Sequence, residues 1–137
     1  MLDSLNLVAL ALATIASMAI GAAWYSALAK PWMAANQFSQ DQIDQVNSGG
    51  SPWIYAVAAV CHLIMAYVLN GVLHHANAYT LFGGVLSAFL IWVGFVATSM
   101  TVNHRFQMKP WSLTVIDAGH YLVVLLAQGA ILGWFGV

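Results

Sequence analysis

Apolar residues fill four long stretches of this chain, and polar residues gather in the shorter segments between them. The apolar stretches cover residues 5–28, 53–73, 79–101 and 112–135. Each can cross a hydrocarbon core of about 30 Å as an α-helix, because a helix rises about 1.5 Å per residue. The pattern therefore predicts an all-α fold, in which one domain over residues 1–137 forms a bundle of four membrane-spanning helices.

Composition places the chain in the membrane class independently of any motif. Hydrophobic residues make up 62% of the sequence and charged residues 5%, whereas a soluble domain carries roughly 25% charged residues. We therefore expect an integral membrane protein whose partner is the lipid bilayer. A net charge of −1, with three Lys and Arg residues in total, argues against nucleic acid as a partner, because phosphates require a basic surface.

Small residues in two of the apolar stretches indicate close helix packing. The first stretch carries a small residue at every fourth position, at Ala9, Ala13, Ser17 and Gly21. The third stretch has two pairs with the same spacing, Gly83/Ser87 and Gly84/Ala88. Membrane helices approach closely where such residues line up, so we expect these positions to face neighbouring helices.

The longest polar segment covers residues 30–52 and follows the first apolar stretch. Pro31 discourages a continuation of the preceding helix. Ser39 and Gln42 have the spacing of a capping box, which predicts a short helix over residues 40–47 on the membrane surface. An irregular loop is the alternative for this segment.

Aromatic and basic residues flank the apolar stretches, as is typical of membrane interfaces. We predict interface anchors at Trp24, Tyr25, Lys30, Trp32, Trp53, Lys109 and Trp111. The three basic residues lie in or beside the first and third connections, at Lys30, Arg105 and Lys109. Because basic residues favour the cytoplasmic side, these two connections are predicted to be cytoplasmic and both termini external.

The second and fourth apolar stretches resemble each other at one constant offset. Residues of the second stretch that recur in the fourth, with an Asn/Gln exchange, are Pro52, Trp53, Val57, His62, Asn70 and Gly71; their counterparts are Pro110, Trp111, Val115, His120, Gln128 and Gly129. The pattern predicts a parallel repeat of two helical hairpins about an axis along the membrane normal. His62 and His120 would then lie at equal depth near the midplane. The alternative is coincidence among aromatic caps and small residues.

Polar side chains within the predicted spanning helices mark the candidate site. They are Asp117, His120, Tyr121 and Gln128 in the fourth stretch, and His62 and Asn70 in the second. An ionised carboxylate near the centre of a membrane helix costs about 2.5–3.5 kcal/mol, so Asp117 needs a partner or a function. It has Ala59 as its counterpart in the repeat. One reading is a site for protons, small ions or solutes; the other is hydrogen bonding between helices, with Asp117 accepting from Trp24 or Tyr25.

The paired histidines also allow a third reading, in which His62 and His120 ligate haem or a metal ion. The leading expectation is nevertheless a protein without a cofactor or metal. The sequence contains no Cys-x-x-Cys, no His-Glu-x-x-His, no Gly-x-Ser-x-Gly and no glycine-rich phosphate loop. We therefore expect a protein that is not an enzyme.

Several segments together resemble the DUF1761 family, small bacterial membrane proteins of unknown function. They are Gly21 to Ser26 with Lys30 and Trp32, Trp92 to Ala97, Pro110-Trp111, Ile116 to Leu122, and Gly129 to Leu132. The resemblance spans nearly the whole chain. It implies a four-helix protein of the bacterial inner (cytoplasmic) membrane, and it supplies no activity.

Three functional hypotheses follow from these residues. The first is a non-enzymatic membrane protein that moves protons, an ion or a small solute past Asp117 and His120. The second is a structural or accessory subunit without transport activity, and the third is a haem- or metal-binding protein that uses His62 and His120. We expect a homo-oligomer, because one protomer of this size leaves little surface for a solute path.

Overall fold

The computed structural model describes residues 5–135. Within this part the elements are all helical: α1 (Leu7–Ala27), α2 (Ala29–Asn36), α3 (Gln40–Asn47), α4 (Pro52–His75), α5 (Leu81–Ile91), the π-helical segment η1 (Trp92–Ala97), α6 (Thr98–Phe106) and α7 (Trp111–Phe135). Four helices are long and apolar enough to cross a membrane, with α5, η1 and α6 forming one continuous helix. The predicted all-α fold with four spanning helices is confirmed, and the protein is a multi-pass membrane protein.

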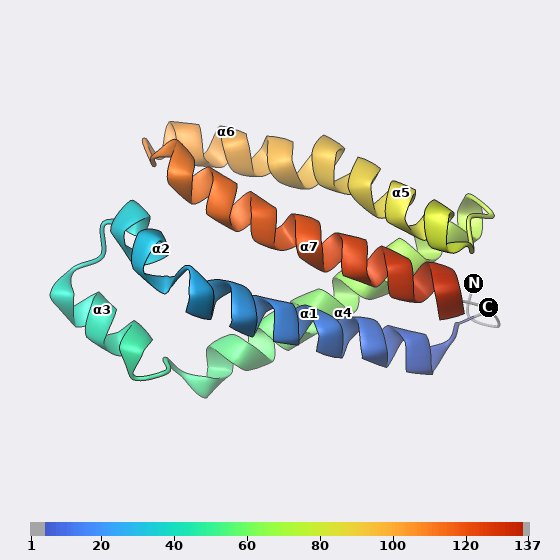
Figure 1. The fold of residues 1–137 in the computed structure, drawn as a ribbon, viewed down its shortest axis with the longest axis horizontal. Helices are drawn as coiled ribbons and strands as arrows, with labels where there is room; N and C mark the ends of the chain where they lie inside the picture. Colours follow the sequence, from blue (N-terminus) through green and yellow to red (C-terminus); the bar gives the residue numbers. More distant parts are fainter. Residues whose placement is uncertain (1–4, 136–137) are drawn as a thin grey trace.

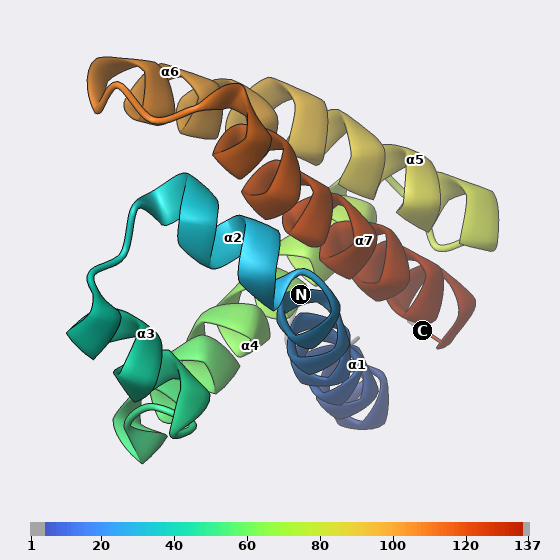
Figure 2. The ribbon, with the colours of Figure 1, turned by 60° about the vertical axis from the view of Figure 1, so that its left-hand side comes forward.

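The spanning helices alternate in direction, so the described ends of the chain lie together with the α4–α5 connection (Figure 1). The opposite end carries α2, α3 and the α6–α7 connection. Helix α7 lies between the α5–α6 helix and α1 in both ribbon views (Figures 1 and 2). It packs most extensively against α5 and α1, while α4 packs mainly against α1. A side chain on α7 can therefore contact helices from both halves of the chain.

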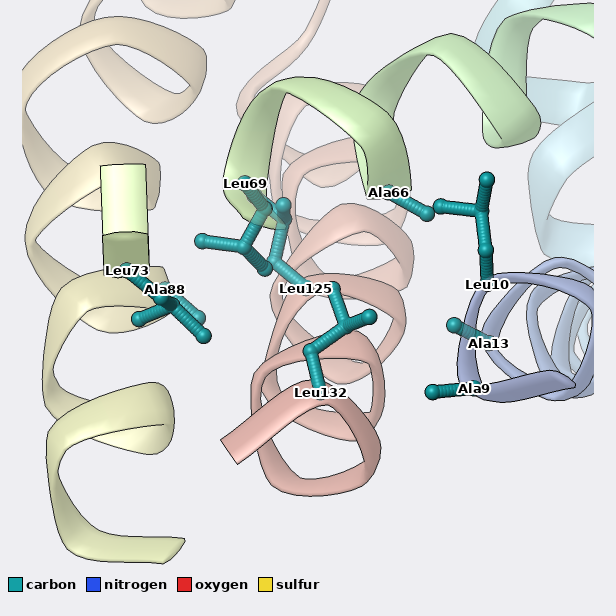
Figure 3. Close-up of a cluster of buried hydrophobic side chains, with 9 residues drawn as sticks. All are labelled: Ala9, Leu10, Ala13, Ala66, Leu69, Leu73, Ala88, Leu125 and Leu132. Atoms are coloured by element: carbon teal, nitrogen blue, oxygen red, sulfur yellow. The ribbon is translucent and has the colours of Figure 1, made fainter. Parts of the chain in front are cut away.

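The apolar core joins these helices through small and branched side chains. Ala9 and Ala13 of α1 have no exposed surface, and Leu10 of α1 points toward Ala66 of α4 (Figure 3). Ser17, the next member of the predicted small-residue ladder, is also fully buried. The ladder therefore faces neighbouring helices, as the sequence predicts.

The closest helix contact joins α5 to α7 through glycines. A Cβ atom on Gly84 would collide with the backbone carbonyl of Gly129, and a Cβ atom on Gly133 would collide with the carbonyl oxygen of Thr80. The two backbones therefore touch along this line. Such an approach is possible where neither helix carries a side chain at the contact.

The polar segment 30–52 is more helical than the sequence predicts. The expectation that Pro31 ends the helical region is wrong, because α2 runs from Ala29 to Asn36 with Pro31 in its first turn. A proline is tolerated there, since the first backbone N–H groups of a helix have no intrahelical partner. The short helix at 40–47 is present as α3, and its capping box is formed: Gln42 N donates to Ser39 Oγ and Ser39 N donates to Gln42 Oε1.

The third spanning helix departs from its predicted bounds of 79–101. It begins at Leu81 and continues to Phe106, so residues expected in a polar loop are helical. The extension is stabilised by α7, because Arg105 donates to Thr114 and its guanidinium lies 3.9 Å from the centre of the Trp111 ring. The π-helical turn in its middle was not predicted. Such turns occur frequently at functional sites.

The predicted hairpin repeat is not matched by symmetric packing. A two-fold arrangement would make the α1–α7 and α4–α5 contacts equivalent, yet α1 packs against α7 much more extensively than α4 packs against α5. His62 and His120 lie close together within the bundle, with ring centroids 6.1 Å apart. The repeat itself stays a prediction.

Candidate functional site

Asp117 is the point at which three other helices meet α7. Its Oδ1 atom accepts hydrogen bonds from the Tyr25 hydroxyl at 2.9 Å and from Trp32 Nε1 at 3.1 Å. Its Oδ2 atom lies 3.8 Å from His104 Nε2. These partners come from α1, α2 and α6, and the Asp117 side chain is 18% exposed. The carboxylate is therefore held by two strong donors with a histidine beside it.

Asp117 lies in the first third of α7. It is six residues after Trp111, the first residue of α7, which corresponds to about 9 Å along the helix axis. The nearby surface is the one that carries α2 and α3 (Figure 1). Asp117 therefore lies on the side of the bundle that carries α2 and the end of α6.

Two tryptophans hold the α7 backbone on either side of Asp117. Trp24 Nε1 donates to the carbonyl oxygen of Ile116 at 3.0 Å, and Trp92 Nε1 donates to that of Ala118 at 2.7 Å. The alternative in which Trp24 donates to the Asp117 carboxylate is therefore wrong, and Tyr25 makes that bond instead. Because Trp92 lies in the π-helical segment, the irregular turn of the third spanning helix contacts the backbone beside Asp117.

Basic and hydroxyl groups surround the outer side of Asp117. Thr114 Oγ1 accepts from Arg105 Nη2 at 3.0 Å and lies 3.0 Å from His104 Nδ1. Lys109 Nζ donates to the carbonyl oxygen of Asn36, at the C-terminal end of α2. Sequence reasoning missed His104 as a site residue, because it was assigned to a loop.

His120 and His62 meet in the interior of the bundle. Both are almost fully buried, with 4% and 6% of their surface exposed. The His120 ring centroid also lies 5.0 Å from that of Tyr25 and 4.8 Å from that of Tyr121. Both ring nitrogens of His120 are buried without a hydrogen-bond partner among the described residues, and His62 Nδ1 lies 3.4 Å from the sulfur of Met18.

The two buried amides predicted for the site have different surroundings. Gln128 has no exposed surface, and its Nε2 atom donates to Ser17 Oγ at 2.9 Å and to the His62 carbonyl at 3.1 Å. It therefore belongs to the His62–His120 site. Asn70 instead accepts from the Tyr79 hydroxyl at 3.2 Å, beside the α4–α5 connection, which places it in another part of the bundle.

Comparison with known proteins gives the family of this chain. The family described as "Protein of unknown function (DUF1761)" matches residues 8–133. The chain belongs to the DUF1761 family. Comparisons with curated proteins and with solved structures found no match. The family assignment agrees with the resemblance seen in the sequence segments. It names no activity for this DUF1761 member.

The predicted anchors of this DUF1761 member divide into two groups. Trp53 and Trp111 are mostly exposed, as is Lys30, and they are free to contact lipid headgroups. Tyr25 and Trp32 are half-buried and donate to Asp117. Tyr25 of α1 and Trp32 of α2 therefore form one wall of the site.

The paired histidines of this DUF1761 member do not fit a haem as they are packed. A Cβ atom on Gly21 of α1 would lie 3.3 Å from His120 Nε2, so the α1 backbone closes that side of the ring. A porphyrin between His62 and His120 would force α1, α4 and α7 apart. In the described part of the chain, no group of three or more His, Cys, Asp or Glu side chains is placed to share a metal ion.

Two hollows on this DUF1761 member lie away from the polar site. One of about 620 Å³ is lined by Tyr67, Gly71 and His75 with their neighbours on α4. The other, of about 380 Å³, lies between α3 and the start of α4. Neither is lined by Asp117 or His120. Asp117, Tyr25 and His120 form a row of polar side chains in direct contact.

Proposed function

We propose that this DUF1761 protein carries protons across the membrane, with Asp117 and His120 as the carrying groups. The observation that supports this role best is their connection through one residue. Tyr25 donates its hydroxyl to Asp117, and its ring packs against the His120 ring at 5.0 Å. Carboxylate, phenol and imidazole are groups that accept and release protons, and intramembrane rows of such groups are typical of proton relays.

The proposed path begins at the surface that carries α2 and α3. His104, whose Nε2 atom lies 3.8 Å from the Asp117 carboxylate, is the titratable side chain that meets Asp117 on that side. Asp117 passes the proton inward past Tyr25 to His120, whose two unpartnered ring nitrogens have a free lone pair for it. Beyond His120, the path continues toward His62 and Gln128. No bond to a substrate is made or broken, so the proposed role is not enzymatic.

The test is proton uptake by liposomes that contain the purified protein. A potassium diffusion potential, negative inside, is imposed with valinomycin, and the interior pH is followed with a trapped dye. We expect the liposome interior to acidify faster when the protein is present than in protein-free liposomes. If liposomes with and without the protein acidify equally under every gradient, the proton role is wrong.

A structural or accessory role is the second candidate. The hydrogen bonds that other helices donate to the Asp117 side chain favour it. Tyr25 of α1 and Trp32 of α2 both donate to one oxygen of this carboxylate. Hydrogen bonds between membrane helices stabilise association by about 0.6–2 kcal/mol each. On this reading the polar residues hold the helices together, and the protein assists a partner protein without transporting protons, ions or solutes itself.

We also propose that the protein lies in the bacterial inner membrane with both termini outside. Arg105 and Lys109 lie at the end of the bundle that carries α2 and α3, as does Lys30, while the α4–α5 connection has neither Lys nor Arg. Alkaline phosphatase fused after Val137 should therefore be active in cells, and green fluorescent protein at the same point should be dark. The reverse pattern would place the termini in the cytoplasm.

A further inference from the structure

Three side chains of metal-ligating types, from three helices, form a row of contacts that includes two residues of the proposed proton path. Met18 of α1 places its sulfur 3.4 Å from Nδ1 of His62 on α4, and the His62 ring centroid lies 6.1 Å from that of His120 on α7. Gly21 follows Met18 by about one turn and faces Nε2 of His120. Residues three apart lie on the same side of a helix, so the face of α1 that carries Met18 also faces His120.

His120 has an unused binding capacity in this place. A neutral imidazole carries one N–H donor and one lone pair, and both nitrogens of His120 are buried without a partner among the described residues. Buried polar groups are paired in the great majority of native structures. We therefore expect a further group or ion that forms a hydrogen bond with this ring or binds to its lone pair.

We propose that Met18, His62 and His120 bind one Cu(I) ion within the bundle. Thioether sulfur is a soft ligand that selects Cu(I), and imidazole also suits copper. A nitrogen and a sulfur bound to one metal at about 2.0 Å and about 2.3 Å lie about 3.4 Å apart when the angle between them at the metal is about 105°. The separation between His62 Nδ1 and the Met18 sulfur, 3.4 Å, agrees with that distance.

The separation of the two histidines also suits a shared ion. Two imidazoles bound to one metal at about 2.0 Å have ring centroids about 6 Å apart when the angle between them at the metal is about 150°, which completes a planar site with three ligands. The observed separation is 6.1 Å. A single ion needs far less space between these side chains than a porphyrin does.

The ligand set distinguishes Cu(I) from a divalent ion. Met18, His62 and neutral His120 carry no charge, so the charge of the ion remains uncompensated by its ligands. The cost of a charge in a medium of low dielectric constant rises with the square of that charge, which favours a monovalent ion here. Structural zinc sites usually add thiolates or reach four ligands, and neither is provided by this trio.

The binding experiment uses the full-length protein with its single cysteine replaced. Cys61 is exposed and would bind Cu(I) by itself, so Cys61→Ser is the parent for all variants. Cu(I) is kept reduced with ascorbate and titrated in competition with bicinchoninate. We expect one Cu(I) per chain, a loss of affinity of at least tenfold in Met18→Leu, and loss of binding in His62→Leu.

Two control variants carry the same substitutions outside the trio. Met65→Leu removes a partly buried thioether one turn from His62, and His75→Leu removes an exposed imidazole from the same helix. Both should bind Cu(I) like the Cys61→Ser parent.

X-ray absorption of that parent should show one sulfur and two imidazole ligands, a result that does not depend on whether any variant folds.

Three results would overturn the copper proposal. They are an absence of Cu(I) uptake by the Cys61→Ser parent, equal affinity in Met18→Leu and Met65→Leu, and an absorption spectrum without a sulfur ligand. Cu(I) and a transferred proton would use the same lone pair of His120, so proton flux is measured on copper-free protein, and the copper proposal and the proton proposal can then fail separately. Copper binding without proton flux would leave this proposal standing, and proton flux without copper binding would leave the proton path standing.

Discussion

Asp117→Asn is expected to abolish proton flux while the protein remains folded and inserted. The asparagine keeps the shape of the side chain, and its amide oxygen can still accept from Tyr25 and Trp32, which now bind Oδ1 of the carboxylate. It removes the group that takes up and releases a proton. Flux is measured in liposomes at equal protein content, and thermal stability is measured in detergent.

The stability of the same variant separates the two candidate roles. Replacement of a buried charge by a neutral isostere is often neutral or stabilising, so we expect a melting temperature equal to or above that of the parent. Asp41→Asn is the matched control, because Asp41 is exposed on α3 near the same membrane surface. If Asp117→Asn and Asp41→Asn both conduct protons like the parent, Asp117 is a structural residue.

Gly84→Ala is expected to destabilise the bundle more than any other single methyl addition at a glycine of α5. The added Cβ would collide with the backbone carbonyl of Gly129, and a backbone atom cannot move aside without shifting α5 away from α7. Overpacking of this kind costs about 1–3 kcal/mol and sometimes more. The free energy of unfolding in mixed micelles, followed by circular dichroism, measures the effect.

The control for this substitution lies on the same spanning helix. A Cβ atom on Gly94 would have no neighbouring atom within 4 Å in the described structure. The free energy of unfolding of Gly94→Ala should therefore equal or slightly exceed that of the parent, because alanine favours helix over glycine. Equal destabilisation by the two substitutions would show that the α5–α7 contact is looser than described.

The features that could be predicted from the sequence are those determined by local pattern. Hydropathy alone located the four spanning helices, and the spacing of Ser39 and Gln42 located α3 with its capping box. The sequence offered Trp24 or Tyr25 as a donor to Asp117, and Tyr25 makes this bond in the structure. A carboxylate within an apolar helix needs a donor, and a tyrosine near the end of the neighbouring helix could provide one.

The features that could not be predicted depend on contacts between distant segments. Trp32 was assigned to a membrane interface and His104 to a loop, although both meet Asp117. Their positions depend on α2 and on the extension of α6, and both elements are stabilised by α7. The π-helical turn likewise has no signature in the spacing of apolar residues, and the Trp92–Ala118 bond beside it is visible only in the folded chain.

The most direct measurement of the central claim is the rate of proton uptake by liposomes as the number of protein copies per liposome is increased. At a fixed potassium diffusion potential, the account predicts that the rate rises with copy number and is unchanged when sodium replaces other external cations. A rate equal to that of protein-free liposomes at every copy number would contradict it. In that case, the row from Asp117 through Tyr25 to His120 holds helices together and carries no protons.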